Sequence, residues 1–473
     1  MVMDLQVRGL QIFFATEIGG VYYMDLMKVY NKLPILGQNI ACSIEGKRIK
    51  KNRYNKEFNK TLHSYKQRSN WTYEQKCEFR DKRLQKMIRY CYQSVPYYRK
   101  IFDEYGINPD TINSLDDLKV LPFLTKNMVK DNFEDLISND FDKNRMIKRS
   151  TSGTTGSGLT FYTTDKAIHE QFATFWRARN NIGIEFEEYN ATFGGQNVVP
   201  LEQNKPPFWR YNIPGNQVYF SVFHLHEKNI ESYISELGKK KIKWIHSYPS
   251  SISLIAKYMI ENDIELKHKI RYITTGSENL MDTQKDMIYN AFGVVPYQHY
   301  GQAENVAIFS EDLDHKILVD EDFSAVEFIY DSELQIYKVV GTSLNNYAMP
   351  FIRYEIGDVA KFKETSYGRE IISVDGRKDD YITLTNGSKI GRLSVAFRNL
   401  INISEAQIIQ KRIGEINIRV VKGRDYNLED EKQLIKNMQT KIGETEKINI
   451  EYVNVIPKTK NGKLRFVISE IKK

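Results

Sequence analysis

The stretch from residue 241 to residue 301 has the most regular succession of apolar and amphipathic segments in the chain. Short apolar runs typical of buried strands alternate there with longer segments whose apolar positions recur at helical spacing. The predicted elements are strands at 243–248, 270–275 and 294–300 and helices at 250–262 and 282–292. This β-α-β-α-β order predicts a parallel sheet, and ligands of such sheets bind beyond the carboxyl ends of the strands. We therefore expect Tyr248, the loop at 275–278 and the loop at 301–304 to lie along one rim.

A separate amphipathic helix is predicted over residues 83–95. Apolar side chains recur there at helical spacing, at Leu84, Met87, Ile88, Cys91 and Val95. Pro96 lacks the amide hydrogen that a helix interior needs, so we expect the helix to end in a turn at that residue.

The pattern changes after about residue 377, where short strands are separated by polar residues. The predicted elements are strands at 407–410, 417–421 and 448–453 and a helix at 428–442 with Asn427 as its N-cap. We expect an α/β fold with a large N-terminal domain over residues 1–378, built from several subdomains with β-α-β sheet layers. Its first 100 residues are expected to be mostly helical, and a small, mobile α+β domain is expected over residues 379–473.

Composition narrows the class of protein. At 473 residues, with 41% apolar and 27% charged residues, the chain suits an ordered globular protein of two or more domains. The net charge of +8 is spread along the chain and no clustered basic and aromatic face stands out, which disfavours nucleic-acid binding. Three scattered cysteines exclude a disulfide framework and suit a reducing cytoplasm. Glu17 and Asp25 interrupt the apolar stretch near the amino terminus, so neither a membrane span nor a secretion signal is expected.

A run of small residues at 150–158 reads Ser-Thr-Ser-Gly-Thr-Thr-Gly-Ser-Gly. Glycines allow several backbone N–H groups to face one anion, and hydroxyls add uncharged donors, as a phosphate-binding loop needs. Gly153 and Gly158 have the Walker A spacing, but Leu159 and Thr160 stand where Lys and Ser or Thr are required. The run therefore predicts a phosphate loop outside the P-loop class, or alternatively a polar surface linker.

Five later segments also carry residue types that suit a nucleotide site. They read Thr-Thr-Gly-Ser-Glu at 274–278, Tyr-Gly-Gln-Ala-Glu at 300–304, Arg-Tyr-Glu-Ile-Gly-Asp at 353–358, Gly-Arg-Lys-Asp-Asp at 376–380 and Pro-Lys-Thr-Lys-Asn-Gly-Lys-Leu-Arg at 457–465. A carboxylate can accept hydrogen bonds from both ribose hydroxyls, and its hard oxygens suit Mg²⁺. A lysine can neutralise charge that develops on a phosphate. Each segment alone is equally typical of a turn or a solvated loop, so the prediction rests on their combination.

In identity and order these segments resemble the adenylate-forming superfamily of acyl-CoA synthetases, peptide-synthetase adenylation domains and luciferases. The chain is most similar to the phenylacetate-CoA ligase branch with its CapK-like capsule-biosynthesis relatives, from about residue 84 to the C-terminus; segments 95–99 and 121–126 also match that branch. The resemblance implies activation of a carboxylic acid with ATP and Mg²⁺ to acyl-AMP, with release of pyrophosphate. Transfer of the acyl group to CoA would follow. A homodimer is one option for the assembly.

The resemblance also assigns a role to each matched position. Phosphate binding is implied for Thr151, Ser152, Gly153, Thr154, Thr155 and Gly156, and adenine binding for Gly276, Ser277, Glu278 and Tyr300. Ribose binding is implied for Asp358 and Arg377, Mg²⁺ binding for Glu304, catalysis for Lys463 and the hinge of the small domain for Asp379.

The acyl pocket is expected beside the converging strand ends. Its candidate residues are Gly194, Gly195, His246, Tyr248 and His299. A satisfied, semi-buried histidine is an equally good interpretation of either histidine, and the two glycines equally suit a turn.

Three functions stay open at this point. Ala303 stands where the family has Thr, so one phosphate contact is absent and a non-catalytic nucleotide-binding homologue is a minority alternative. Among enzymes, a ligase that transfers the acyl group to an amine, in surface polysaccharide biosynthesis, competes with the CoA ligase. The sequence identifies neither the acid nor the acceptor.

Overall fold

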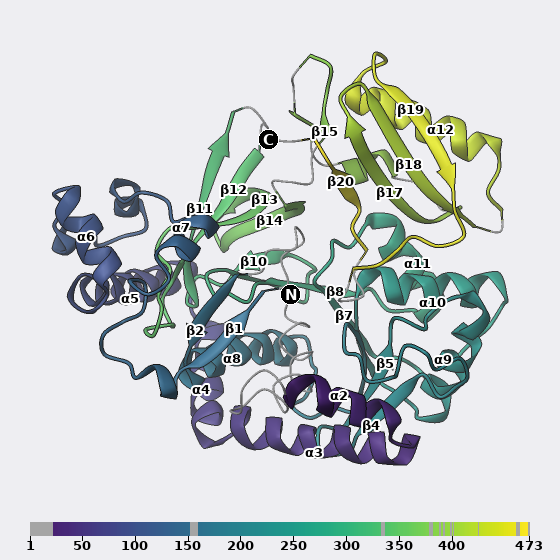
Figure 1. Cartoon of the computed structure of the whole chain (residues 1–473), viewed down its shortest axis with the longest axis horizontal. Helices are drawn as coiled ribbons and strands as arrows, with labels where there is room; N and C mark the ends of the chain where they lie inside the picture. The colour runs from purple at the N-terminus through teal and green to yellow at the C-terminus, as the bar shows by residue number, and fades with distance from the viewer. Residues whose placement is uncertain are drawn as a thin grey trace.

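The computed structural model of the chain describes residues 22–151, 159–332, 336–377, 382–386, 389–390, 393–397, 400, 402–423, 425–459 and 464–471. A large α/β part is followed by a smaller α+β part at the C-terminus, which confirms the predicted fold class (Figure 1). Within the described ranges, none of the helices is both long and apolar enough to cross a lipid bilayer.

Helices dominate the first part of the chain and pack around the sheet (Figure 1). They are α2 (Tyr22–Lys32), α3 (Ile35–Arg53), α4 (Lys56–Gln67), α5 (Tyr73–Ser94), α6 (Pro96–Glu104), α7 (Lys126–Asp131) and α8 (Asp165–Asn181). The helix predicted at 83–95 is the second half of α5, which begins earlier at a capping box formed by Thr72 and Gln75. The predicted turn at Pro96 is wrong: one extended residue, Val95, separates the two helices, and Pro96 takes the first position of α6, where a missing N–H costs nothing.

One mixed sheet of twelve strands forms the centre of the large part. The strand order is β11-β12-β13-β14-β10-β9-β8-β7-β6-β3-β5-β4. The bounds are β3 Asn190–Gly194, β4 Trp209–Asn212, β5 Gln217–Ser221, β6 Trp244–Ser247, β7 Tyr272–Gly276, β8 Tyr297–Gly301, β9 Ile308–Glu311, β10 Ile317–Val319, β11 Ser324–Asp331, β12 Ile336–Ser343, β13 Tyr354–Thr365 and β14 Gly368–Arg377. A separate hairpin joins β1 (Ile147–Ser150) to β2 (Thr160–Thr163).

The predicted β-α-β-α-β unit is confirmed at β6 to β8. These strands are mutually parallel and are connected by α10 (Pro249–Glu261) and α11 (Asp282–Phe292), while α9 (Glu227–Lys239) precedes β6. Gly293 ends α11 with φ 67°, a left-handed conformation that glycine adopts without steric cost. The carboxyl ends of β6, β7 and β8 therefore lie side by side.

The two faces of this parallel region differ in chemistry. Alternate side chains of a strand point to opposite faces. The face toward α9 and α10 is apolar and contains Ala191, Phe193, Val218, Phe220, Ile245 and Ile273. The opposite face carries Thr192, Gln217, Trp244, His246 and Thr274. It packs on α8, since the rings of Phe175 and His299 lie 4.1 Å apart and those of Trp176 and Trp244 lie 5.9 Å apart. Parallel strands are normally apolar on both faces, so the polar face marks a candidate site.

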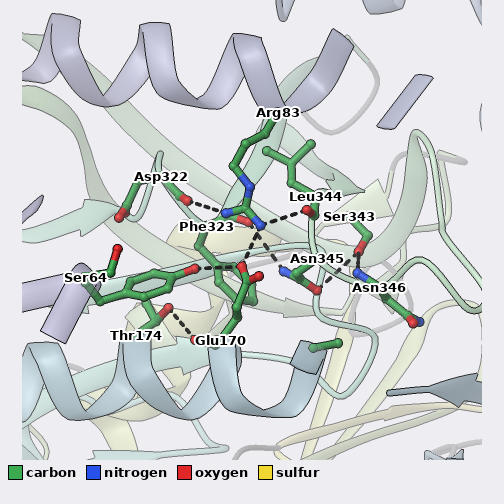
Figure 2. Close-up of polar contacts among 12 residues, drawn as sticks. Ser64, Arg83, Glu170, Thr174, Asp322, Phe323, Ser343, Leu344, Asn345 and Asn346 are labelled. Atoms are coloured by element: carbon green, nitrogen blue, oxygen red, sulfur yellow. Dashed lines mark hydrogen bonds and ion pairs between the residues drawn. The ribbon is translucent and has the colours of Figure 1, made fainter. Parts of the chain in front are cut away.

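A partly buried ionic network holds α8 in place (Figure 2). Glu170 on α8 accepts hydrogen bonds from Arg83 of α5 at 2.5 Å and from Tyr65 of α4 at 3.1 Å. Arg83 also donates to the backbone oxygens of Asp322 and Leu344, at 2.9 and 2.8 Å. These contacts connect α8 to α4 and α5 and, through Arg83, to two loops of the sheet. They therefore fix the position of the side chains on α8 relative to the sheet.

Segments 95–99 and 121–126 have a structural role beside the start of β13. The hydroxyl of Tyr98 donates to the oxygen of Pro350 at 3.0 Å and accepts from the N–H of Ile352 at 2.9 Å. Backbone hydrogen bonds join Leu124 to the start of β13: its N–H donates to the oxygen of Arg353, just before the strand, at 2.9 Å, and its oxygen accepts from the N–H of Glu355 at 3.0 Å. These contacts fix the strand that carries Asp358.

The C-terminal part has its own sheet and core. Its elements are β15 (Ile382–Thr383), β16 (Lys389–Ile390), β17 (Ile403–Arg412), β18 (Glu415–Lys422), α12 (Leu428–Ile442), β19 (Lys447–Tyr452) and β20 (Val467–Ser469). The sheet order is β19-β18-β17-β20, and α12 covers it with Leu434, Met438 and Ile442. Asn427 caps α12 as predicted. The expected boundary at 378–379 falls outside the described residues and stays a prediction.

Candidate functional site

The ends of the parallel strands form a rim. Gly194 pairs with Ser221, and Gly276 pairs with His299, so β3, β5, β7 and β8 end at similar levels. Ser277 follows β7 with φ 71°. Non-glycine residues with positive φ are uncommon, and such strain is often retained where a loop has to present its backbone to a ligand. The predicted adenine loop therefore has an unusual, defined backbone at the rim.

Two of the predicted nucleotide ligands meet directly. The hydroxyl of Tyr300, at the end of β8, donates to Asp358 Oδ2 at 2.7 Å. The ring of Tyr300 stacks on Phe309 with 4.6 Å between ring centres, which fixes its direction. Asp358 lies opposite Arg377 in the β13–β14 ladder. The side chain of Arg377 lies outside what the structure describes, so only its backbone is placed here.

Glu278 joins the rim to the C-terminal part of the chain. Its Oε2 accepts from the N–H of Ser250 in the first turn of α10, at 3.1 Å, and its Oε1 accepts from the N–H of Leu464, also at 3.1 Å. A carboxylate is favoured at a helix N-terminus, where free N–H groups carry partial positive charge. Glu278 was predicted at the adenine; in this structure its carboxylate holds two backbone segments together.

Several predicted residues lie outside the described part of the chain. They are Ser152, Gly153, Thr154, Thr155, Gly156, Asp379 and Lys463. Thr151 is described, and it closes the base of the predicted phosphate loop: its N–H donates to Leu159 O at 2.7 Å and its hydroxyl accepts from Leu159 N–H at 3.0 Å. Leu464 follows Lys463 in the sequence, so its bond to Glu278 is the described contact nearest to the predicted catalytic lysine.

Glu304 follows β8 and is buried, with 9% of its surface exposed. Among the described residues, no group of three or more His, Cys, Asp and Glu side chains is arranged to hold a metal. Mg²⁺ commonly uses one or two protein carboxylates together with substrate phosphates and water, so a single carboxylate at the rim fits that ion. The neighbouring Ala303 packs in an apolar cluster with Val306 and Met349.

Two cavities lie between α8 and the polar face of the sheet. The larger is about 70 Å³ and the smaller about 30 Å³, and both are lined by Arg179 and His246. The smaller also reaches His299 and Gly276, so it approaches the rim. At about 10–15 Å³ for each water, the larger has room for roughly five water-sized groups and the smaller for roughly two.

Two of the five predicted pocket residues line the cavities, and three do not. His246 and His299 line the cavities. Tyr248 is fully buried, and its hydroxyl accepts from the N–H of Gly195 at 3.0 Å, which joins the loop after Gly194 to the end of β6. Neither glycine nor Tyr248 lines either cavity.

Sequence reasoning missed Arg179, Trp176 and Trp244 as lining residues. Arg179 and Trp176 lie on α8, far from the strand-end motifs in sequence. A signal was present in β6, where His246 interrupts a strand that a parallel sheet would normally fill with apolar residues.

Comparison with known proteins adds a second line of evidence. A family model of the CapK C-terminal domain matches residues 382–470. The chain is 27% identical over 457 residues to Protein CapK of Staphylococcus aureus, a match covering 94% of this chain and 99% of that protein. It is 23% identical over 324 residues to a phenylacetate-coenzyme A ligase of Pseudomonas putida, covering 64% of this chain and 70% of the ligase. A crystal structure of 2-hydroxyisobutyryl-CoA ligase in the postadenylation state superposes with a TM-score of 0.62 at 18% identity, covering 83% and 89% of the two chains.

The large mixed sheet and the separate C-terminal domain are the fold of adenylate-forming ligases. In sequence the chain is similar to CapK and to the phenylacetate-CoA ligases. The resemblance stated from the motifs is thereby confirmed, in sequence by these relatives and in fold by the superposed ligase.

Proposed function

We propose that this chain activates a carboxylic acid with ATP, forming acyl-AMP and releasing pyrophosphate, and then transfers the acyl group to CoA. The observation that carries the proposal is the hydrogen bond between Tyr300 and Asp358 at the strand-end rim. It brings together two motifs that are 58 residues apart in the sequence and that both suit the nucleoside part of ATP.

Nucleotide binding is assigned to three groups of residues. Asp358 accepts hydrogen bonds from the ribose hydroxyls while Tyr300 holds its carboxylate, and Arg377, whose backbone pairs with Asp358 in the ladder, is assigned to the ribose as well. The strained loop at Gly276 and Ser277 packs against adenine. The loop from Thr151 to Gly156, whose base is closed by Leu159, surrounds the leaving phosphates.

The first half-reaction needs positioned charge more than a proton carrier. A carboxylate oxygen of the acid attacks the α-phosphorus of ATP, the bond from that phosphorus to its bridging oxygen breaks, and pyrophosphate leaves. Lys463 offsets negative charge between the acid and the α-phosphate, and Glu304 would hold Mg²⁺. When bound, that ion supplies positive charge to the phosphate oxygens.

The second half-reaction uses the small domain. We propose that it rotates about Asp379, which withdraws the segment around Leu464 from Glu278 and opens a path for the acceptor. The thiolate of CoA then attacks the acyl carbon, and AMP leaves with the electrons of the broken acyl–phosphate bond.

An amine acceptor is the second candidate. Similarity to Protein CapK covers 94% of this chain, whereas similarity to the CoA ligase of Pseudomonas putida covers 64%. In this alternative, which the resemblance to the CapK-like relatives left open, an amine in surface polysaccharide biosynthesis accepts the acyl group in place of CoA.

Pyrophosphate exchange tests the proposal. Labelled pyrophosphate should enter ATP only in the presence of an active acid, and Lys463→Ala should slow the exchange by roughly 100- to 1,000-fold, as expected for loss of a group that stabilises transition-state charge. Trapping the products with CoA and with hydroxylamine then separates the acceptors. Hydroxamate without acyl-CoA for every active acid would exclude the thioester. ATP binding without exchange on any acid would mean a non-catalytic nucleotide-binding protein.

A further inference from the structure

We propose that the acid activated by this chain is a dicarboxylic acid, and that Arg179 binds its second carboxylate in the cavities between α8 and the polar face of the sheet. This inference rests on the proposed function, because it names the class of acid that the same site would activate.

Arg179 is a buried cation held between two indole rings. It is 7% exposed, and its guanidinium carbon lies 4.9 Å from the ring centre of Trp176 and 5.1 Å from that of Trp244. Arg177, two residues earlier, is paired with Asp322 at 2.7 Å, but no carboxylate of the described residues lies within ion-pair distance of Arg179. Burying a charge without a partner is costly, so proteins rarely leave one uncompensated. The missing anion is therefore expected to come from a ligand.

Two carboxylates line the cavities, and each has other partners. Glu311 accepts from the N–H of Gln298 and from His315. Glu187 is paired with Lys50 at 2.7 Å. Neither therefore compensates the charge of the guanidinium.

Three buried nitrogen atoms belong to residues that line the smaller cavity. Arg179 Nη1, His246 Nε2 and His299 Nε2 have no hydrogen-bond partner in the described part of the chain, and all three residues line this cavity. The large majority of buried polar atoms in folded proteins are hydrogen-bonded, so each exception calls for an explanation. Three exceptions around one small space are accounted for by the oxygen atoms of a bound group.

The protonation states make these nitrogens suited to an anion. Burial lowers the pKa of Arg179 to about 10, which still leaves it charged at neutral pH. Burial and the nearby Arg179 lower the pKa of His246 to about 3 and that of His299 well below its usual value, so both rings are neutral. Thr274 Oγ1 accepts from Trp244 Nε1 at 2.9 Å and lies 2.8 Å from His246 Nδ1. We assign its hydrogen to His246 Nδ1, which leaves a donor proton on Nε2.

The position of Arg179 sets the length of the acid. Trp244 begins β6, whereas Gly276 ends the paired strand β7 at the rim. His246 pairs with Thr274, two residues before Gly276. The levels of His246 and Trp244 are thus two and four strand residues from the rim. At about 3.3 Å for each residue along a strand, the second carboxylate lies roughly 7–13 Å from the rim. A medium-chain or aromatic dicarboxylate spans that separation, and a short diacid such as succinate does not.

The experiment compares each diacid with its own monomethyl ester in pyrophosphate exchange by the full chain. The panel runs from succinate to sebacate and includes terephthalate, with benzoate and phenylacetate as monoacids. For the preferred diacid, kcat/KM should exceed that of its half ester by about 100-fold or more, the scale expected when one partner of a buried charge pair is removed. Arg179→Met should abolish this ratio and Arg179→Lys should restore part of it. Arg89→Met, which removes an exposed arginine paired with Asp110, is the matched control and should leave the ratio unchanged.

A binding measurement separates this inference from the proposed function. Without ATP, the preferred diacid should raise the unfolding temperature of the parent chain and not that of Arg179→Met, with circular dichroism as the check that the variant folds. Equal use of diacids and half esters, with a ratio that Arg179→Met does not alter, would overturn the dicarboxylate assignment while adenylation stands. If no acid of the panel supports pyrophosphate exchange but a diacid still binds in a way that depends on Arg179, adenylation would be overturned and the anion site retained.

Discussion

Replacing Tyr300 with phenylalanine isolates the contact on which the nucleotide site depends. The substitution removes one hydroxyl and keeps the ring that stacks on Phe309 at 4.6 Å. It therefore deletes the 2.7 Å hydrogen bond to Asp358 without opening a cavity. Hydrogen bonds to charged groups contribute about 1.5–3 kcal/mol, and both side chains are only half-buried, so water replaces part of the loss. We expect about 1–2 kcal/mol, which is roughly a 5- to 30-fold rise in the KM for ATP.

The assay is pyrophosphate exchange at varied ATP with a saturating active acid. The KM for the acid should change little, because Tyr300 lines neither cavity beside α8. Asp358→Asn and the double variant complete a double-mutant cycle. The loss of ATP affinity in the double variant should be smaller than the sum of the losses in the two single variants, as it is for groups in contact. An unchanged KM for ATP in Tyr300→Phe, or strict additivity in the cycle, would refute the role given to this pair.

Three further perturbations test other parts of the structure. Arg353→Met leaves Glu327 buried without its 2.8 Å partner, and should lower the free energy of unfolding by about 3–5 kcal/mol in a denaturant titration; a loss under 1 kcal/mol would contradict it. Glu278→Ala removes the acceptor for Leu464, and should slow adenylation about tenfold while sparing transfer from supplied acyl-AMP; equal slowing of both steps would exclude this role. Burial opposes ionisation of Asp322, yet its ion-pair partners keep its pKa well below the usual range. The ionised Asp322 therefore stabilises the folded protein at pH values above its pKa in the unfolded chain, about 4, and this stabilisation is lost as the pH falls below that value. Unfolding midpoints between pH 5 and 3 should fall more steeply for the parent chain than for Asp322→Asn.

Local patterns predicted the elements well where one segment determines its own structure. The helix predicted at 282–292 has the bounds of α11, and the helix at 428–442 has those of α12. Both carry their own end signals, Gly293 after the first and Asn427 before the second. At Pro96 the same reasoning predicted the end of α5 but missed the start of α6, because a proline that ends one helix is equally favourable at the first position of another.

The site was predictable only in part, because its residues come from distant segments. Parallel strands bring their ends to one rim, so the positions of Gly276 and Tyr300 followed from the order of elements. Arg179 did not follow from that order. Its role depends on how α8 packs across the sheet, and that packing is set by ionic contacts such as Arg83 with Glu170, between helices 87 residues apart. No periodic pattern records such a contact.

The two-faced sheet has a consequence for how this chain can change. Neighbouring residues in β6 serve different purposes, since Ile245 belongs to the apolar core and His246 lines the cavities. A substitution at His246 therefore alters what the cavities accept, whereas the same substitution at Ile245 would disturb folding. Relatives that bind different ligands are expected to differ at every second position of β3, β5, β6, β7 and β8. Laboratory selection for a new acid can be confined to those positions while the intervening residues keep the domain stable.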